Sequence, residues 1–272
     1  MNPARIDRAL VILGYLAQHQ EGCTLKRLCD DLALPMSSAH DLLQVLVGLD
    51  AVKLLGQRTY ALGPRSVVLA LSIVDSVDIR HVSRPYLVEL CEEINENTYL
   101  AVRSGGSVVY ADRQEAGQTL SVVMKLGGPR PLHGSAVGKL MAACNADLEQ
   151  RVLHAPDLEK YTPYTLVNRD RLRHEFEGIR TSGYSVSDGE SVEGILGVAT
   201  PVVDASGAVN AAVHVSAPRG RLSPDRLPFV VAAMSRTGAQ ISRQLGAAQD
   251  AVRPRSLDEI RAFEAGRRGA RQ

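Results

Sequence analysis

Residues 24–48 read TLKRLCDDLALPMSSAHDLLQVLVG, and their pattern decides the expected fold of the first part of the chain. Thr24 precedes leucines spaced three and four residues apart, which predicts an N-capped amphipathic helix. Pro35 disfavours helical backbone at the residue before it, so a tight break is expected there. A second helix is expected to begin near Ser37 or Ser38. The stretch therefore predicts two short helices joined by a tight turn.

The segments on either side of this helix pair complete a familiar order of elements. Upstream, residues 5–21 carry apolar side chains at helical spacing, and the expected inward face consists of Ile6, Ala9, Leu10, Leu13, Leu16 and Ala17. Downstream, residues 52–55 and 59–62 flank Gly56-Gln57-Arg58, which predicts a β-hairpin with a glycine in its turn. Helices and a hairpin in this order are typical of a winged helix-turn-helix, a DNA-binding unit.

The second helix of the pair has a polar face slim enough to enter a major groove. A recognition helix buries one stripe on its neighbours and keeps the opposite face free for base edges and phosphates. The candidate DNA contacts are Ser37, Ser38, His40, Asp41 and Gln44 on this helix, Lys26 and Arg27 on the helix before it, and Lys53, Arg58 and Thr59 on the hairpin. His40 and Gln44 could reach base edges, whereas serine hydroxyls suit phosphates. A merely solvated helix face is the alternative for each of these residues.

The charge balance limits how such a unit can bind a polyanion. The 272-residue chain has 31 Lys and Arg against 30 Asp and Glu, for a formal net charge of +1. Residues 1–62 are neutral as well, with six basic and six acidic side chains. Attraction to any nucleic acid needs a basic surplus, so we expect weak non-specific affinity. Hydrophobic residues at 45% and charged residues at 22% are ordinary globular values and exclude a collagen-like or wholly disordered chain.

The cysteines and the apolar segments point to an intracellular protein without a metal site. Cys23, Cys29, Cys91 and Cys144 are scattered, with no spacing that would hold zinc, so we expect reduced and mostly packed thiols. The N-terminus carries charges where a signal peptide needs an apolar run. The apolar stretch 67–74 is far too short to span a membrane. We therefore expect no metal, no cofactor and no membrane partner.

The rest of the chain predicts a helical connector and a second, mixed domain, which makes the fold class α+β. Residues 64–95 read as almost continuous helix with a break at 75–78. Expected strands cover residues 98–103, 108–113, 121–125, 183–187, 196–203 and 209–216, and expected helices cover 135–144, 147–153, 170–182 and 224–245. The expected division is a winged helix-turn-helix at 1–63, a helical linker at 64–78, a mixed α/β domain at 79–248 and an Arg-rich tail at 249–272.

Two places in the second domain suggest a ligand site. The glycine-rich stretches 127–128 and 134–136 can bring backbone amides near a helix start, where the helix dipole suits a carboxylate or another anion. An ordinary serine cap at Ser135 is the alternative. His214 and Ser216 alternate along a predicted strand and share one face, and Gly197 on a neighbouring strand is expected to leave room beside them. A structural histidine is the alternative at position 214.

In this order and at these separations, the motifs resemble the IclR-type bacterial transcriptional regulators over about residues 5–246. The stretches that carry the resemblance are SSAHDLL at 37–43, YALG at 60–63, LHGSAVGK at 132–139, DGE at 188–190, and Gly194 followed by ATP at 199–201. The resemblance implies an N-terminal winged helix-turn-helix and a C-terminal GAF-like effector-binding domain. It also implies dimers or tetramers on palindromic operators.

The resemblance further implies an effector pocket in the second domain. The residues expected to bind the effector are Met124, Leu126, Gly127, His133, Gly134, Ser135, Ala136, Ser187, Asp188, Glu190, Gly197, His214 and Ser216. The chain departs from the family pattern at three positions. Asp41 stands where an arginine is usual, Gly197 where cysteine or another small polar residue is common, and His214 where many relatives have serine. These departures argue against transferring a known ligand or operator directly.

The combined interpretation is a ligand-responsive, DNA-binding regulator that controls a catabolic operon, with repression as the commoner role in the family. We expect a homodimer or a dimer of dimers on a palindromic double-stranded operator, with a small carboxylic acid or aromatic catabolite as effector. The expected location is the bacterial cytoplasm, on the nucleoid when DNA is bound.

Two other classes of protein stay open from the sequence alone. A metabolite-binding module with weak or lost DNA binding would account for Asp41 and the neutral first domain. A small hydrolase centred on Ser135, with His133 or His214 as base, is the more distant alternative. No GxSxG elbow surrounds Ser135 and no third residue stands out to orient a base, so we expect no enzymatic activity and no catalytic residue.

Overall fold

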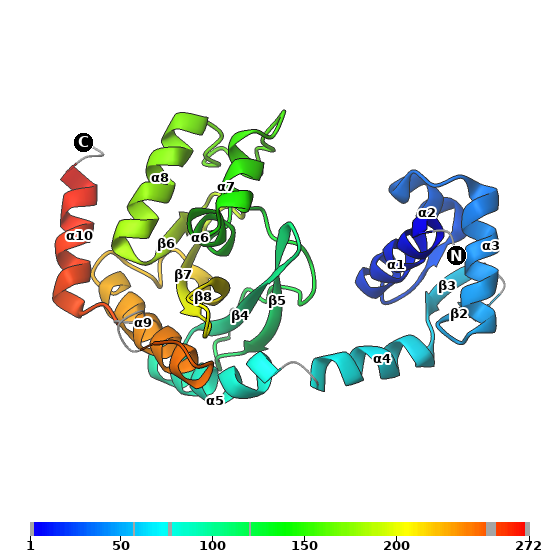
Figure 1. Ribbon diagram of the computed structural model, residues 1–272, viewed down its shortest axis with the longest axis horizontal. Coiled ribbons are helices and arrows are strands. Elements are labelled where there is room, and N and C mark those ends of the chain that lie inside the picture. Colours follow the sequence, from blue (N-terminus) through cyan, green and yellow to red (C-terminus); the bar gives the residue numbers. More distant parts are fainter. Residues whose placement is uncertain (1–2, 57, 76–77, 120, 249–253, 270–272) are drawn as a thin grey trace. The chain divides into compact units, whose positions relative to one another are not determined.

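The computed structural model describes residues 3–56, 58–75, 78–119, 121–248 and 254–269 (Figure 1). The chain forms two compact units, Met1–Asp78 and Ile79–Gln272. Gln57 of the expected hairpin turn, residues 76–77 of the expected break, and residues 249–253 and 270–272 of the expected tail lie outside the described residues. None of the helices in the described part combines the length and apolar character needed to cross a bilayer.

The first unit contains α1 (Pro3–Gln18), β1 (Cys23–Thr24), α2 (Leu25–Leu32), α3 (Met36–Gly48), β2 (Val52–Leu55), β3 (Thr59–Leu62) and α4 (Pro64–Asp75). The helix-turn-helix follows from local sequence as predicted. The Thr24 hydroxyl accepts a hydrogen bond from the backbone N–H of Arg27 at 3.4 Å and so caps α2. Ala33 ends α2 in the left-handed region at φ 51°, and Pro35 precedes the first residue of α3.

A two-residue strand, β1, enlarges the predicted hairpin into a three-stranded antiparallel sheet with the order β1-β3-β2. Cys23 pairs with Tyr60 and Thr24 with Thr59. Gly22 makes this pairing possible, because it adopts φ +77° and a β-carbon there would lie 2.7 Å from the Tyr60 carbonyl oxygen. The strand is too short to show any alternation in the sequence, which is why the pattern did not predict it.

The inward face predicted for α1 is partly wrong. The core takes Ile12 and Leu16, whereas Ile6 and Leu10 are exposed. The core of this short domain buries only one side of α1. That side includes Ile12 and Leu16, so the buried face is rotated about the helix axis relative to the predicted one. An apolar stripe therefore remains on the outside of α1.

The second unit contains α5 (Asp78–Ile94), β4 (Asn97–Ser104), β5 (Ser107–Gln114), α6 (Ala136–Cys144), α7 (Ala146–Leu153), α8 (Arg169–Ser182), β6 (Ser185–Asp188), β7 (Ile195–Val203), β8 (Val209–Pro218), α9 (Leu227–Gln244) and α10 (Leu257–Gly269). The strands form an antiparallel sheet with the order β5-β4-β8-β7-β6. Most predicted elements are present, with their ends shifted by a few residues.

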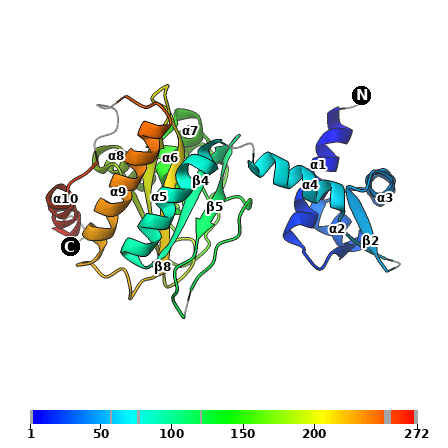
Figure 2. The same cartoon turned by 90° about the horizontal axis from the view of Figure 1, so that it is seen from below.

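Helices cover both faces of this sheet and build two cores (Figures 1 and 2). On one face α5 and α9 pack against Leu100, Val198 and Val213. On the other face α6, α7 and α8 pack against Tyr99 and Ala101. Alternation along each strand produces this division, since successive side chains point to opposite faces. Residues that share a face with Tyr99 therefore lie under α6.

The strand predicted at 121–125 is wrong. Residues 121–125 belong to no strand of the sheet, and side chains of β4 take several of the hydrogen bonds that a neighbouring strand would take. The Val122 carbonyl accepts from Asn97 Nδ2 at 3.2 Å and from the Tyr99 hydroxyl at 3.1 Å. The Met124 N–H donates to the same hydroxyl at 3.2 Å. Residues 115–119 and 121–130 therefore form an irregular segment that is hydrogen-bonded to β4 and β5, and this segment is called the strap below.

The Arg-rich tail contributes to the core, although its sequence indicated little more than a helical spacing. Ile260 of α10 is only 1% exposed and joins the core beneath α9. The Tyr184 hydroxyl donates to Glu264 Oε1 at 2.6 Å, and the Tyr184 and Phe263 rings meet edge to face. Arg255 donates its backbone N–H to Ser235 Oγ at 2.8 Å. The second unit thus extends through the described part of the tail.

Candidate DNA interface and effector site

The exposed face of α3 holds the side chains predicted to contact DNA. Ala39, Leu42, Leu43 and Leu46 are buried against the rest of the first unit. Ser37, His40, Asp41 and Gln44 lie on the exposed side. This division is what a recognition helix requires, because a groove admits a slim polar face on a helix that is fixed from behind.

Two of the predicted contacts on α3 already have partners within the first unit. Ser38 is half-buried, and its Oγ accepts a hydrogen bond from Arg8 Nη1 at 3.2 Å. His40 Nδ1 lies 3.8 Å from Asp41 Oδ1.

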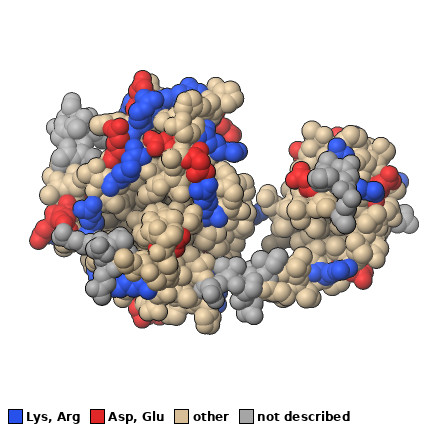
Figure 3. All heavy atoms as spheres, in the orientation of Figure 1, with Lys and Arg blue, Asp and Glu red and all other residues tan. Residues whose placement is uncertain are grey.

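The basic residues around α3 are exposed but not gathered into one patch. Lys26, Arg27, Lys53 and Arg58 are all exposed, and Arg27 Nε lies 3.7 Å from Asp31 Oδ2. Figure 3 shows Lys and Arg interspersed with Asp and Glu over the visible face of this unit. The remaining hairpin candidate, Thr59, is half-buried and pairs with Thr24 and Leu55 in the sheet. The mixed charges on the surface of the first unit therefore agree with the equal numbers of basic and acidic side chains in residues 1–62.

In the second unit, strand register assembles a row of small polar residues under α6. Ser187 pairs with Gly197, Gly197 with Ser216, and Ser216 with Asn97, so one row crosses four strands. The neighbouring row contains Ala199, His214 and Tyr99. Asn97 and Tyr99 were not predicted, since their importance comes from a pairing between strands more than a hundred residues apart. The structure brings the predicted Gly197, His214 and Ser216 together.

His214 is buried among aromatic rings and is held neutral. Its Nδ1 donates to the Val198 carbonyl at 2.9 Å, and its ring lies 5.2 Å from that of Tyr110 and 5.7 Å from that of Tyr99. Burial, together with the smaller effect of the Arg130 charge, lowers the pKa of His214 to about 3, although the hydrogen bond to the Val198 carbonyl acts in the opposite direction. With Nδ1 carrying the proton, Nε2 remains as an acceptor.

The space expected beside Gly197 is filled by His214. A β-carbon at position 197 would approach His214 Cε1 to 3.0 Å and the Ala136 β-carbon to 3.6 Å. The glycine therefore accommodates the imidazole itself. The chain departs from the family pattern at Gly197 and at His214, and these two departures fit each other. The larger side chain on β8 packs against the residue on β7 that has no side chain.

Ser135 and His133 are occupied by structural hydrogen bonds. Ser135 caps α6, since its Oγ accepts from the Gly138 N–H at 3.0 Å and donates to the Pro131 carbonyl at 2.6 Å. His133 Nε2 donates to the Glu159 carbonyl at 2.8 Å. Neither residue is oriented as a nucleophile or a base for the other. Their position beside the sheet is compatible with a ligand that meets the α6 N-terminus.

Asp188 and Glu190 line a separate cavity of about 750 Å³, between α8, α6 and the loop at 163–166. Asp188 Oδ2 is paired with Arg219 at 3.0 Å. Glu190 Oε1 accepts from the buried Lys139 at 2.6 Å, and Lys139 also contacts Glu175 at 3.2 Å. Burial raises the pKa of Glu190, whereas Lys139 acts in the opposite direction. Two of the predicted effector residues thus belong to two different ion pairs at a cavity whose lining does not include the His214 row.

The remaining predicted residues lie on the strap or next to it. Met124 is half-buried against the core under α6, whereas Leu126 is exposed and forms no wall in this structure. Gly127 adopts φ +74° and donates its N–H to the Tyr110 carbonyl at 2.9 Å. Ser187 Oγ donates to the Gly134 carbonyl at 2.7 Å, which ties β6 to the start of α6.

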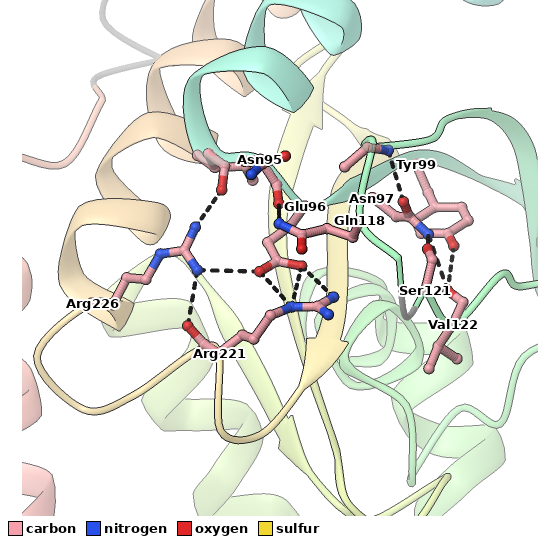
Figure 4. Close-up of polar contacts among 11 residues, drawn as sticks. Asn95, Glu96, Asn97, Tyr99, Gln118, Ser121, Val122, Arg221 and Arg226 are labelled. Carbon is pink, nitrogen blue, oxygen red and sulfur yellow. Dashed lines mark hydrogen bonds and ion pairs between the residues drawn. The ribbon is translucent and has the colours of Figure 1, made fainter.

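Three consecutive residues after α5 hold the strap and the β8–α9 loop in place (Figure 4). The Asn95 carbonyl accepts from Gln118 at 3.0 Å. Glu96 is fully buried and pairs with Arg221 at 2.8 Å and Arg226 at 3.1 Å. Asn97 Nδ2 donates to Ser121 Oγ at 2.6 Å, and its Oδ1 accepts from the Ala116 N–H. The residues that directly follow α5 are therefore hydrogen-bonded to the strap.

Neutral His214 predicts a specific pH dependence of stability. Its folded pKa of about 3 lies below the ordinary histidine value, so the unfolded chain binds a proton that the folded chain does not. The contribution of neutral His214 to the unfolding free energy is fully present above about pH 6.5 and is lost as the pH falls toward 3. We expect this group alone to remove about 2 kcal/mol of unfolding free energy between pH 7 and pH 5. Urea unfolding of the wild type and His214→Gln at both pH values measures it, and equal losses in the two proteins would contradict the assignment.

Comparisons with known proteins agree with both units. The IclR helix-turn-helix domain matches residues 5–55, and the bacterial transcriptional regulator IclR C-terminal domain matches residues 71–243. The chain therefore belongs to the IclR family, as its resemblance predicted. It is a ligand-responsive, DNA-binding transcriptional regulator rather than an enzyme. The predicted fold class, a winged helix-turn-helix followed by a mixed α/β effector domain, is confirmed.

Individual members of the family are similar to this chain over most of its length. It is 31% identical over 245 residues to the HTH-type transcriptional repressor AllR of Klebsiella pneumoniae, covering 89% of each chain. It is 24% identical to the regulator KipR of Bacillus subtilis, covering 89% of this chain and 96% of KipR. A putative IclR regulator from Silicibacter sp. TM1040 superposes with a TM-score of 0.80 at 26% identity, covering 90% and 97% of the two chains.

An IclR homologue from Microbacterium hydrocarbonoxydans, solved in complex with 4-hydroxybenzoate, shares the fold. Its TM-score is 0.71 at 22% identity, covering 87% of this chain and 100% of the homologue.

Proposed function

We propose that this protein is a repressor of a catabolic operon that binds a palindromic operator as a homodimer and is controlled by a small organic acid or aromatic catabolite. The observation that carries the DNA-binding part is the exposed polar face of α3, with Gln44 and His40 on it, over a fully buried opposite stripe. Repression is supported by the similarity to AllR, a transcriptional repressor.

Exposed apolar helix faces support a second copy of the chain as partner. Val68 of α4 is 62% exposed and Leu71 is 64% exposed, and on α1 Leu10 is 64% exposed. Exposed apolar side chains of this size on two helices of one unit are the kind of surface that a symmetric dimer would cover. A dimer also presents two α3 helices to one DNA, and this doubling offsets the low charge of each copy.

The hydrogen bonds around the strap support a route from effector to DNA-binding unit. A ligand in the His214 row would lie against the strap, and Asn97 joins the strap to the end of α5. A ligand that binds one arrangement of the strap more tightly would shift the population of α5 positions. The helices α4 and α5 would then act as the lever that alters the spacing of the two α3 helices.

Mobility shift of the promoter DNA beside the gene tests the proposal. Gln44→Ala should weaken operator binding about tenfold, because a glutamine that reads a base edge contributes about 1–3 kcal/mol of discrimination. Gln20→Ala is the matched control, since Gln20 is also exposed but precedes β1 and lies off α3. The control should bind like the wild type. The salt dependence should correspond to fewer than the about six to ten phosphate contacts of strongly basic DNA-binding proteins.

Absence of any shift by a folded wild-type dimer would contradict the proposal and favour a metabolite-binding module without DNA binding. Equal losses in Gln44→Ala and Gln20→Ala would show that α3 does not read the operator.

A further inference from the structure

Apart from the titratable His40, the only ionisable side chain on α3 is that of Asp41. The helix is described throughout, reads MSSAHDLLQVLVG over Met36–Gly48 and contains no lysine or arginine. The commonest specific contact of a recognition helix is an arginine or lysine that donates to guanine O6 and N7, and α3 lacks it. Base recognition by α3 therefore depends on neutral polar groups and on one carboxylate.

The part of α3 that carries Asp41 is held firmly from behind. Leu42 is 5% exposed and Leu43 is 0% exposed, so the residues directly after Asp41 are anchored in the core of the first unit. The Asp41 side chain itself is 74% exposed. At helical spacing it shares the exposed face with Ser37 and Gln44. Because the side chain is short, the fixed backbone largely determines where its carboxylate reaches.

The first unit gives Asp41 no structural role that would explain a carboxylate. Among the residues that the structure describes, its one titratable neighbour within 4 Å is His40, whose Nδ1 lies 3.8 Å from Asp41 Oδ1, too far for a hydrogen bond. A negative charge favours the helix dipole in the first turn, but Asp41 is the sixth residue of α3 and lies beyond that turn. Aspartate is also a poor helix former, and its charge repels phosphates. Both carboxylate oxygens are therefore available to an outside donor.

The chemistry of a carboxylate limits which base it can recognise in the major groove, because an ionised carboxylate only accepts hydrogen bonds. Guanine presents N7 and O6 there and thymine presents O4, and all three are acceptors that repel a carboxylate. Adenine presents the N6 donor beside the N7 acceptor, a pair that suits an amide such as that of Gln44. Cytosine presents its N4 amino group, from which a carboxylate accepts a charge-assisted hydrogen bond. Cytosine is therefore the base that fits Asp41.

We propose that Asp41 is a specificity-determining residue that accepts a hydrogen bond from the amino group of one cytosine in each half-site of the operator. This inference rests on the proposed function, because it names a base that the operator must contain. The carboxylate also disfavours other bases at that pair and weakens attachment to unrelated DNA, so it contributes to specificity more than to affinity. The equal numbers of basic and acidic side chains in residues 1–62 act in the same direction.

Mobility shift of the promoter DNA, with the base pairs of each half-site varied in turn, tests the inference. The wild type should require a C·G pair at one position, and any other pair there should weaken binding at least about tenfold. Placing 2-pyrimidinone opposite the same guanine removes only the amino group of that cytosine and should weaken binding by a similar factor. Asp41→Ala should bind all of these DNAs within about twofold of one another and should still discriminate at the other base pairs.

Asp41→Asn distinguishes base recognition from a mere loss of charge. The asparagine amide matches adenine N6 and N7, so the preference should move from C·G to A·T at the same pair. The matched control is Asp30→Ala, which removes an exposed carboxylate from α2, off the recognition helix. The control should change the affinity for all sequences alike and leave the base preference unchanged. Both alanine variants should fold with at least the wild-type Tm, because alanine is the better helix former.

Two results would overturn the inference while the proposed function stands: an unchanged base preference in Asp41→Ala, or equal binding of the cytosine and 2-pyrimidinone operators by the wild type. An Asp41→Ala protein that gains affinity for every sequence to the same extent as Asp30→Ala would show that the carboxylate only repels phosphates. The proposed function fails separately, if the folded wild type does not shift the promoter DNA, and the inference then fails with it.

Discussion

Replacing Gly138 with alanine is expected to prevent stable folding of the effector-binding unit. A β-carbon at this position would lie 2.0 Å from the Pro131 carbonyl oxygen and 2.6 Å from the Leu132 Cα atom. Both are backbone atoms, and the Pro131 carbonyl is fixed because it accepts hydrogen bonds from the N–H and Oγ of Ser135. We expect a loss of about 3 kcal/mol or more, at the upper end of the cost of overpacking a core. Thermal and urea unfolding followed by circular dichroism measure it.

Gly178→Ala is the control for this substitution. Gly178 lies inside α8, and a β-carbon there meets no heavy atom within 4 Å. The change should stabilise the helix by roughly 0.5–1 kcal/mol, because alanine loses less conformational freedom on folding than glycine. A Gly138→Ala protein with wild-type stability would show that the start of α6 can separate from Pro131.

Replacing Lys139 with methionine is expected to destabilise the same unit by about 3 kcal/mol, since removal of one partner leaves a buried charge uncompensated. Lys139 is 1% exposed and contacts Glu190 at 2.6 Å and Glu175 at 3.2 Å. Without it two carboxylates face each other in a poorly solvated site. Burial already raises the pKa of Glu190, and the loss of Lys139 would raise it further above its unfolded value, so the loss should be largest at neutral pH and should shrink as the pH falls.

A double-mutant cycle with Glu190→Gln checks the assignment. Adding Glu190→Gln to Lys139→Met should recover part of the lost unfolding free energy, because the repulsion between the Glu190 and Glu175 carboxylates is removed. Additive losses would show that Lys139 and Glu190 do not interact in solution.

Local patterns predicted the first unit well, because its elements depend on neighbours in the sequence. Thr24 defines the start of α2 because its side chain caps the helix, and Pro35 defines the start of α3 because it disfavours helical backbone before it. The exposed face of α3 then follows from helical spacing. The orientation of α1 did not follow, since Ile6, Leu10 and Ile12 are all apolar and only tertiary packing decides which are buried.

The effector site was predictable in part. His214 and Ser216 share a face by simple alternation, and they lie together as expected. The strap was mistaken for a strand because Val122 and Met124 alternate like a strand, whereas their hydrogen bonds go to Asn97 and Tyr99.

The docking of α10 means that the family alignment and the folded unit end at different places. The match to the IclR C-terminal domain stops at residue 243, yet Ile260 supplies a buried side chain to the core beneath α9, and Glu264 accepts from Tyr184 directly before β6. A protein cut at the alignment boundary for expression would expose an apolar cavity in that core. The described part of the tail therefore belongs to the folded effector domain in this member of the family.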